Sequence, residues 1–333
     1  MPASRDQPLK ALVFSIQKMS TEDGPGIRTT VFFKGCSLRC AWCSNPEGIS
    51  AEPVIMWFGV RCIGCQTCVG ACPQGALAMD EDGLHIDRTL CNGCGICATE
   101  CPSGACEIAG KYYTVDELFE EVDKDRVFYA KSGGGVTVSG GEPTMQWQFL
   151  KEFLRTCKEN AINTAIETCG FNTQRVYEQV LPYLDLVMLD LKEMDPAKHA
   201  EFCGHSNDQI LENAKWIGQQ PVEMWIRTPI IPGATATEEN VEAIGAFIKE
   251  HLPNVTRWDL CAFLNLCKSK YERLGIDWAF KDADLFEKDF MEHLADVARD
   301  TGVKCSVAWS GLYKRGESEE GETPLKSPSQ KCC

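Results

Sequence analysis

The cysteines limit what this chain can fold into more than any other feature of its sequence. There are 20 among 333 residues, a content that indicates either a secreted disulfide scaffold or a protein whose thiolates bind metal. Their spacing favours metal, because three tight groups lie at 36–43, 62–72 and 91–101. The polar start, Met1–Lys10, shows no signal peptide, and no stretch reaches the roughly 18 apolar residues of a membrane span. We therefore expect a soluble protein of the reducing cytoplasm that does not contact membranes.

Charge and apolar content narrow the class further. The formal net charge is -15 at pH 7 with every cysteine counted as neutral, so nucleic acid is not an expected partner. Small basic patches could still contact an acidic electron carrier. A hydrophobic content of 44% is ample for a buried core.

Short apolar, β-branched runs alternate with longer amphipathic stretches through most of the chain. Thr114 with Glu117 forms a capping box, and Thr237 precedes another stretch with helical periodicity, so both threonines are expected helix starts. Strands that alternate with helices predict an α/β fold with a parallel sheet covered by helices, as a full or partial barrel. The expected strands are Leu12–Gln17, Arg28–Lys34, Gly135–Ser139, Thr164–Glu167, Leu186–Asp190, Met224–Pro229, Trp258–Phe263 and Cys305–Trp309.

One segment breaks this alternation. Residues 56–111 are dense in Cys, Gly and Pro, contain two similar halves about thirty residues apart, and lack long helical periodicity. They predict a small inserted domain between the first part of the barrel, 1–55, and its remainder, 112–316. The last stretch, 317–333, is rich in Ser, Lys, Glu and Pro, which predicts a disordered tail.

The first group of cysteines, Cys36, Cys40 and Cys43, has the spacing C-x3-C-x2-C directly after an expected strand. Three thiolates in one loop can hold three corners of a four-iron cluster and leave the fourth iron open to a substrate. The alternatives are a zinc site, which would normally recruit a fourth Cys or His, and a chance group of buried cysteines.

With an aromatic residue, Trp42, just before its third cysteine, this loop resembles the signature of the radical S-adenosylmethionine (SAM) superfamily. The resemblance implies that the open iron binds the amino and carboxylate groups of SAM. It also implies that an electron from the cluster cleaves the S–C5′ bond, and that Trp42 lies near the adenine.

The other two groups match the bacterial ferredoxin pattern C-x2-C-x2-C-x3-C-Pro in full. In two-cluster ferredoxins the fourth cysteine of each run binds the other cluster. Zinc is an alternative for either half alone. The clusters would carry electrons to the buried catalytic cluster, or they would have a purely structural role. The expected ligand sets are Cys62, Cys65, Cys68 and Cys101 for one cluster, and Cys91, Cys94, Cys97 and Cys72 for the other.

A glycine pair follows another expected strand, in Ser139-Gly140-Gly141-Glu142-Pro143. Such a pair lets backbone carbonyls approach a ligand, and the neighbouring carboxylate can accept a hydrogen bond from an ammonium group. Alone, the pattern is more often a tight turn. Beside the cysteine loop it resembles the Gly-Gly-Glu-Pro element of the superfamily, which implies that Gly140, Gly141 and Glu142 bind the amino group of SAM.

Longer motifs resemble one family within this superfamily, the glycyl radical enzyme activating enzymes. The family implies a partial (β/α)6 TIM-like barrel, and the inserted ferredoxin-like domain fits members whose partners differ from pyruvate formate-lyase. The motifs are Asp23-Gly24-Pro25-Gly26-Ile27-Arg28-Thr29, Cys43-Ser44-Asn45-Pro46-Glu47, Glu167-Thr168-Cys169-Gly170-Phe171, Leu189-Asp190-Leu191-Lys192 and Trp225-Ile226-Arg227.

The resemblance also implies a reaction. The enzyme would cleave SAM reductively and abstract a hydrogen atom from the Cα of one glycine on a partner glycyl radical enzyme. Positioning of C5′ against that Cα would be the main work of the protein. The implied cofactors are three 4Fe-4S clusters, SAM and, as a candidate, a monovalent cation, and the electron donor would be a flavodoxin or a ferredoxin.

Further contacts follow from the resemblance position by position. Lys192 would pair with the methionyl carboxylate of SAM, Asp190 would lie beside the ribose or a cation, and Arg227 would lie near the sulfonium. Residues alone favour ordinary ion pairs for Lys192 and Arg227. Asn265 is expected as a polar contact in place of a histidine found near the adenosyl group in pyruvate formate-lyase activators. The expected cation ligands are Glu167, Thr168, Met188 and Asp190.

Asp23, Gly24 and Arg28 resemble residues around the groove that receives the glycyl loop of the partner, and they could equally form a turn with a structural arginine. The cysteines outside the three groups show no ligand spacing of their own. Two other functions stay open: a radical SAM enzyme that acts on a small molecule or peptide, and a pure electron carrier. Cys157, Cys261 and Cys305 are expected to be buried apolar residues, and Cys332 and Cys333 to be spectators.

Overall fold

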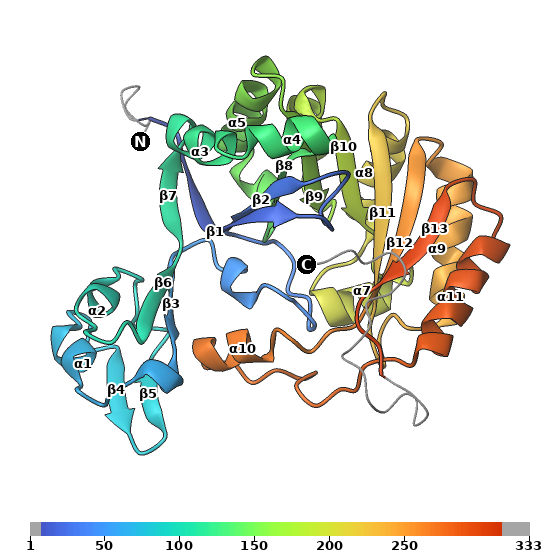
Figure 1. Ribbon diagram of the computed structural model, residues 1–333. Coiled ribbons are helices and arrows are strands. Elements are labelled where there is room, and N and C mark those ends of the chain that lie inside the picture. The colour runs from blue at the N-terminus through green and yellow to red at the C-terminus, as the bar shows by residue number, and fades with distance from the viewer. Residues whose placement is uncertain (1–7, 315–333) are drawn as a thin grey trace.

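A computed structural model describes residues 8–314, so the expected tail with Cys332 and Cys333 lies outside the described residues. Its centre is a nine-stranded sheet in the order β13-β12-β11-β10-β9-β8-β2-β1-β7, with helices packed around it (Figure 1). The sequence produces this sheet because β-branched, apolar runs favour extended backbone and burial on both faces. The inner strand β8 (Gly135–Gly140) is buried at five consecutive positions.

Seven neighbouring strands of this sheet run parallel. β1 (Lys10–Ser20) pairs antiparallel with the first of them, and β7 (Lys111–Thr114) pairs antiparallel with β1. All eight strands expected from the sequence are present, which confirms the α/β class and the parallel-rich sheet. The sheet has one parallel strand more than the six of the expected barrel, because β13 pairs with β12. The parallel strands are β2 (Arg28–Phe33), β8, β9 (Asn163–Thr168), β10 (Leu186–Asp190), β11 (Glu223–Ile230), β12 (Val255–Ala262) and β13 (Ser306–Ser310).

Amphipathic helices cover the sheet because their apolar positions recur every three to four residues. In α5 (Trp147–Glu159), for example, one face buries Phe149, Phe153 and Cys157. Within residues 8–314, no helix is long and apolar enough to cross a membrane. The other helices around the sheet are α3 (Val115–Asp123), α4 (Arg126–Ser132), α6 (Gln174–Val180), α7 (Pro196–Cys203), α8 (Asp208–Gly218), α9 (Glu238–His251), α10 (Lys268–Leu274) and α11 (Lys288–Asp300), with short 3-10 turns η1 (Pro46–Gly48), η3 (Pro143–Gln146) and η4 (Leu181–Tyr183).

Both expected helix starts are confirmed. The Thr114 side chain accepts a hydrogen bond from the Glu117 amide at 3.2 Å, and the Glu117 carboxylate accepts one from the Thr114 amide at 2.8 Å. At the start of α9, Thr237 accepts a hydrogen bond from the amide of Asn240. These bonds satisfy amides that have no partner within their own helix.

Replacing Thr114 with alanine is expected to destabilise the protein by about 1 kcal/mol, because the cap of α3 loses both reciprocal bonds. A drop of about 2 °C in the apparent melting temperature corresponds to that loss for a chain of this size. Asp116→Asn, in the same first turn but outside the capping box, is the control and should change the melting temperature less.

The segment from β3 to β6, residues 54–109, forms a small unit of its own, which lies apart from the helical layer (Figure 1). Its two halves each contribute a short helix that starts after a residue with positive φ, Gln66 and Gly95. Its own core contains Ile55, Leu77 and Leu84 together with cysteines. The elements are two antiparallel pairs, β3 (Val54–Trp57) with β6 (Cys106–Ala109) and β4 (Leu77–Asp80) with β5 (Gly83–Ile86), the helices α1 (Thr67–Ala71) and α2 (Ile96–Thr99), and the turn η2 (Gly59–Arg61).

Candidate active site

The loop with the first three cysteines begins where β2 ends and is held at both of its sides by backbone hydrogen bonds. On one side, the amide of Cys36 donates to the carbonyl of Ile49, just after η1. On the other side, the amides of Arg39 and Ala41 donate to the carbonyls of Cys203 and Phe202 at the end of α7. The loop is therefore fixed between η1 and α7 by main-chain bonds, which leaves its cysteine side chains free to point into the molecule.

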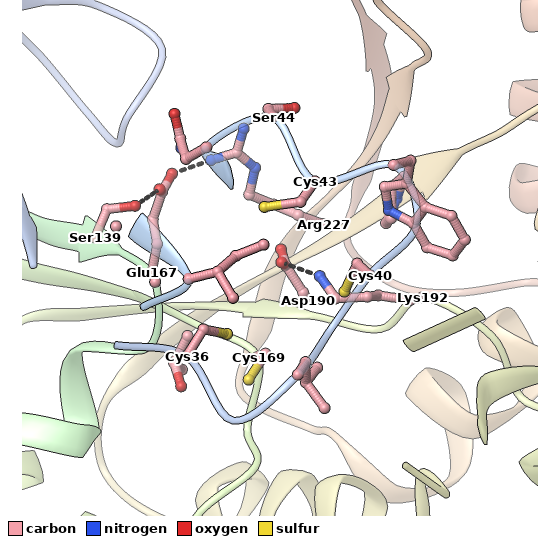
Figure 2. Close-up of a pocket in the computed structure, with 18 of the residues that line it drawn as sticks. Cys36, Cys40, Cys43, Ser44, Ser139, Glu167, Cys169, Asp190, Lys192 and Arg227 are labelled. Carbon is pink, nitrogen blue, oxygen red and sulfur yellow. Dashed lines mark hydrogen bonds and ion pairs between the residues drawn. The ribbon is translucent and has the colours of Figure 1, made fainter. Parts of the chain in front are cut away.

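The cysteine sulfurs of this loop face a cavity at the carboxyl ends of the parallel strands (Figure 2). This is the end of a parallel α/β sheet at which ligands bind. Polar side chains from four strands meet the loop there: Ser139, Glu167, Asp190 and Arg227. The predicted residues that line this one cavity are Cys36, Cys40, Trp42, Cys43, Gly140, Gly141, Glu167, Thr168, Asp190, Lys192 and Arg227.

Lys192 is held against Asp190 at the cavity wall. The Lys192 Nζ lies 2.5 Å from an Asp190 carboxylate oxygen, and the lysine side chain is only 10% exposed. Burial alone would lower the pKa of Lys192, but Asp190 and Cys40 outweigh it and hold that pKa well above its usual range. The cavity therefore keeps a permanent positive charge beside Cys40.

A second ion pair joins Arg227 on β11 to Glu167 on β9, across the intervening strand β10 (Figure 2). The other Glu167 oxygen accepts a hydrogen bond from the Ser139 hydroxyl at 2.5 Å. Burial raises the pKa of Glu167 to about 7, against the opposing pull of Arg227. Arg227 thus reaches the cavity from the side opposite to Lys192, and the cavity presents two cations near three cysteines.

Comparison with known proteins identifies the family to which this chain belongs. Residues 30–244 match the Radical SAM superfamily, a span that contains the cysteine loop and the ion-paired strand ends. The chain belongs to the radical SAM superfamily. Within it, the chain is 41% identical over 91% of its length to the indoleacetate decarboxylase activating enzyme of Tractidigestivibacter scatoligenes, of which it covers 99%.

Two further relatives carry the same kind of name. The trans-4-hydroxy-L-proline dehydratase activating enzyme of Clostridioides difficile is 42% identical, over 80% of this chain and 88% of its own length. The choline trimethylamine-lyase activating enzyme of Oleidesulfovibrio alaskensis is 39% identical, over 83% of this chain and 93% of its own length. The chain is thus a radical SAM activating enzyme of glycyl radical enzymes, which cleaves SAM and forms a glycine radical on a partner.

The glycine pair of this radical SAM fold is required by close backbone packing. Gly140 has φ +122°, a conformation that L side chains rarely adopt. A Cβ on Gly141 would clash with the carbonyls of Gly35 and Gly48. The pair therefore lets β8 end directly under the cysteine loop, which places its backbone at the cavity.

Glu142 differs from its expected position, because it lies behind the cavity wall and not in it. The side chain is fully buried, and its carboxylate accepts hydrogen bonds from the amide and hydroxyl of Thr144, the hydroxyl of Thr168 and the amide of Cys169. The carboxylate is thus held by four donors and does not line the cavity, and its contact with the amino group of SAM stays a prediction. Glu142 braces the end of β9, from which Thr168 and Cys169 face the cavity.

Three of the four expected cation ligands line the cavity, and the fourth, Met188, does not. Met188 is buried in a separate apolar layer with Ala165 and Leu186, so its side chain does not line the cavity. The carboxylates of Glu167 and Asp190 are each already paired with a cationic side chain. A monovalent cation would have to compete with these partners, and the cation site stays a prediction.

Arg28 is a structural arginine, the alternative that the sequence left open. It is fully buried, and its guanidinium donates to Thr137 Oγ1 at 2.6 Å, to the carbonyl of Val136 at 2.8 Å and to Asn163 Oδ1 at 3.0 Å. Its guanidinium therefore faces inward, and a place of Arg28 beside a groove for the partner loop stays a prediction. Gly24 is also buried and lies against the Arg28 side chain.

Two other expected residues lie outside the cavity lining. The Asp23 carboxylate accepts hydrogen bonds from Ser20 at 2.7 Å and Thr30 at 2.5 Å, and it is partly exposed. Asn265 donates to the carbonyl of Ala283 at 3.4 Å. The structure thus shows no contact of Asn265 with the cavity, while Asp23 keeps one face toward solvent.

Sequence reasoning missed three cysteines of the site. Cys169 lines the cavity beside Cys36, and Cys203 at the end of α7 lies beside Cys40. The neighbouring Cys203 thiol is the main cause that lowers the pKa of Cys40 to about 7. Cys261 lines the cavity too and contacts Arg227, so its expected role as a buried apolar residue is wrong.

His199 of α7 is expected to make the stability of the protein depend on pH. It is 1% exposed, and burial lowers its pKa below the usual 6.5, while a hydrogen bond to the His205 carbonyl opposes that shift. A folded-state pKa below the unfolded one means that the unfolded chain binds more protons, so stability falls as pH drops below the unfolded value. We expect the apparent melting temperature to fall more steeply between about pH 7.5 and 5.5 in the wild type than in His199→Gln. Equal slopes would contradict this role, and His293→Gln, at an exposed histidine, is the control.

Proposed function

We propose that this activating enzyme holds one 4Fe-4S cluster on Cys36, Cys40 and Cys43, and binds SAM at that cluster. The observation that carries the proposal is the single cavity in which these three cysteines meet the glycine turn and both cationic side chains, Lys192 and Arg227. When bound, the cluster supplies the electron that cleaves the S–C5′ bond to give methionine and a carbon radical at C5′.

The residues of the cavity would orient SAM for that cleavage. Lys192 would bind the methionyl carboxylate, because it carries a permanent charge at the wall beside Cys40. Backbone groups of Gly140 and Gly141 would bind the amino group, and Trp42 would lie against the adenine. Arg227 would stay with Glu167 at the opposite side of the cavity, and no proton transfer is needed.

The reaction balances without an acid or a base. The C5′ radical takes one hydrogen atom from the Cα of a glycine of the partner, which gives 5′-deoxyadenosine and leaves the unpaired electron on the glycine. Since an exposed C5′ radical would be quenched, the chain must hold C5′ against that Cα and exclude water, which is catalysis by positioning. A flavodoxin or a ferredoxin would supply the electron.

The small unit of residues 54–109 would be an inserted ferredoxin-like domain with two more 4Fe-4S clusters. Four of its cysteines, from both halves of the repeat, surround one cavity. The set is Cys72, Cys91, Cys94 and Cys97, which is the crossed combination that the ferredoxin pattern predicts.

The second set is supported by proximity. Cys101 lies near Cys65 and Cys68, so the fourth cysteine of the second run faces the first run. Among residues 8–314, no three His, Cys, Asp or Glu side chains converge closely enough to hold a single metal ion. The ligands of a four-iron cluster lie farther apart than those of a single metal ion, because each ligand binds a different iron.

The test is anaerobic reconstitution with iron and sulfide, reduction, and addition of SAM with a glycyl radical enzyme. Decarboxylases, lyases and dehydratases that the relatives activate are the partners to try. Formation of 5′-deoxyadenosine together with a glycyl radical seen by electron paramagnetic resonance (EPR) would support the proposal, and a partner with its radical glycine replaced by alanine is the control. If 5′-deoxyadenosine forms and no partner acquires a radical, the small-molecule or peptide alternative would be favoured.

A further inference from the structure

Helix α10 touches the cysteine loop of the active site. Its Tyr271 hydroxyl donates to the carbonyl of Cys43 at 2.8 Å. Lys270 donates to the carbonyl of Ser44 at 3.1 Å and pairs with Glu47 at 2.8 Å. One turn of α10 therefore fixes the loop at and just after its third cysteine.

The other end of α10 touches the small unit of residues 54–109. Leu274 is buried against Met56 of β3 and Ala109 of β6. The guanidinium of Arg88 donates to the carbonyl of Leu274 at 2.8 Å and to that of Ile55 at 2.7 Å. Helix α10 is thus a bridge of direct contacts between this unit and the active-site loop, as its position in Figure 1 also shows.

Strand register decides which cysteine set lies at the bridged end of the unit. In the β3–β6 pair, Val54 is opposite Ala109 at the end that joins the nine-stranded sheet through β7. Trp57 is opposite Cys106 at the far end. The cavity of Cys72, Cys91, Cys94 and Cys97 includes Ile55, beside the joined end.

Two glycines in the second cysteine run confirm that position. A Cβ on Gly93 would clash with the carbonyl of Pro53, which immediately precedes β3, and a Cβ on Gly95 would lie 3.1 Å from Ile108. The opposite set lies near the other end of the β3–β6 pair, where Arg61 donates to the carbonyl of Gly104. Helix α10 also approaches this end, because the Arg273 guanidinium lies 4.4 Å from the centre of the Phe58 ring. The two sets therefore differ in the hydrogen bond that Arg88, close to Cys91 and Cys97, makes to Leu274 of α10.

We propose that the cluster on Cys72, Cys91, Cys94 and Cys97 is the immediate electron donor to the active-site cluster, through Arg88 and α10. This rests on the proposed function, in which both sets hold clusters. Arg88 lies close to Cys91 and Cys97 and hydrogen-bonds Leu274, and Tyr271 one turn earlier hydrogen-bonds the residue that binds the active-site cluster. Electron tunnelling decays steeply with distance and less steeply through bonds than through gaps, so these contacts favour this set.

The step is a transfer of one electron with no bond made or broken. The cluster on the Cys72 set would be oxidised by one electron, and the active-site cluster would be reduced by one electron. A reduced flavodoxin or ferredoxin, as the external reductant, returns the electron to the small unit. The cluster on Cys62, Cys65, Cys68 and Cys101 would then lie earlier in the sequence of transfers.

EPR of the reduced, fully reconstituted protein with SAM tests the order of the clusters. A paramagnetic neighbour speeds spin relaxation, so the active-site signal should saturate more readily once its nearest cluster is lost. Cys94→Ser should therefore lower the half-saturation power of that signal, and the matched Cys65→Ser, at the same place in the other run, should leave it near the wild-type value. The reverse pattern, or an equal effect of both variants, would overturn the proposal.

A second variant tests the route with every cluster in place. Arg88→Met removes the link to Leu274 and touches no cysteine ligand, so iron and sulfide content should stay unchanged. The rate at which reduced flavodoxin reduces the active-site cluster, followed by rapid-freeze EPR, should fall at least tenfold. Arg126→Met, at an arginine that donates to a backbone carbonyl elsewhere, should keep the wild-type rate. An unchanged rate in Arg88→Met would overturn the route.

These outcomes are separate from a failure of the proposed function. If the wild type binds only one cluster by iron count and EPR, the proposed clusters of the small unit are wrong. If it binds all three and the two cysteine variants give the reverse pattern, the proposed function stands and the inference fails.

Discussion

Replacing Cys40 with alanine is expected to abolish the formation of 5′-deoxyadenosine. Cys40 is the middle one of the three loop cysteines, and its side chain faces the cavity (Figure 2). Its loss would leave only Cys36 and Cys43 as ligands of the proposed cluster. The expected loss is at least about a thousandfold in rate, or more than about 4 kcal/mol in the activation barrier. Product would be quantified by chromatography after anaerobic reconstitution and reduction.

Cys305→Ala is the matched control for that measurement. Cys305 is a half-buried thiol just before β13 and does not line the cavity. The variant should keep the wild-type rate and the wild-type iron content. If Cys40→Ala made 5′-deoxyadenosine at the wild-type rate, the cysteine loop would not hold the catalytic cluster, and the assignment of the site would be wrong.

The sequence predicted the parts of the site that depend on local spacing. Cys36, Cys40 and Cys43 lie within one loop, and chain geometry alone keeps them together. Asp190 and Lys192 follow one strand, and parallel strands bring their carboxyl ends to the same edge of the sheet. The local pattern is sufficient for the three cysteines, whereas Asp190 and Lys192 were singled out by the family resemblance, and the cavity contains all five.

The parts that the sequence did not predict depend on the direction of side chains in the packed molecule. Glu142 and Arg28 belong to functional motifs, yet each is enclosed by hydrogen-bond partners from other strands, which no local pattern reveals. Cys203 reaches Cys40 from α7, and its position in the sequence carries no ligand spacing. Cys169 did carry a signal, because it directly follows β9 at the edge where the other site residues lie.

Replacing Lys192 with methionine is expected to weaken SAM binding without removing the cluster. The charged group faces the cavity, and a hydrogen bond to a charged group contributes about 1.5–3 kcal/mol, so the dissociation constant for SAM should rise about 10- to 100-fold. The loss also leaves Asp190 without its cation beside the cysteines, which adds repulsion toward a carboxylate. The change in the EPR spectrum of the reduced cluster on titration with SAM measures this constant.

Two companion variants make the Lys192 result specific. Lys198→Met, at an exposed lysine of α7, should bind SAM as the wild type does. Arg227→Met shows which of the two cations of the cavity binds SAM, because Arg227 is paired with Glu167 and Lys192 with Asp190. An unchanged dissociation constant in Lys192→Met with a raised one in Arg227→Met would assign the methionyl carboxylate to Arg227. Iron content equal to wild type in all three variants would show that the effect lies in SAM binding, because the cluster would be intact.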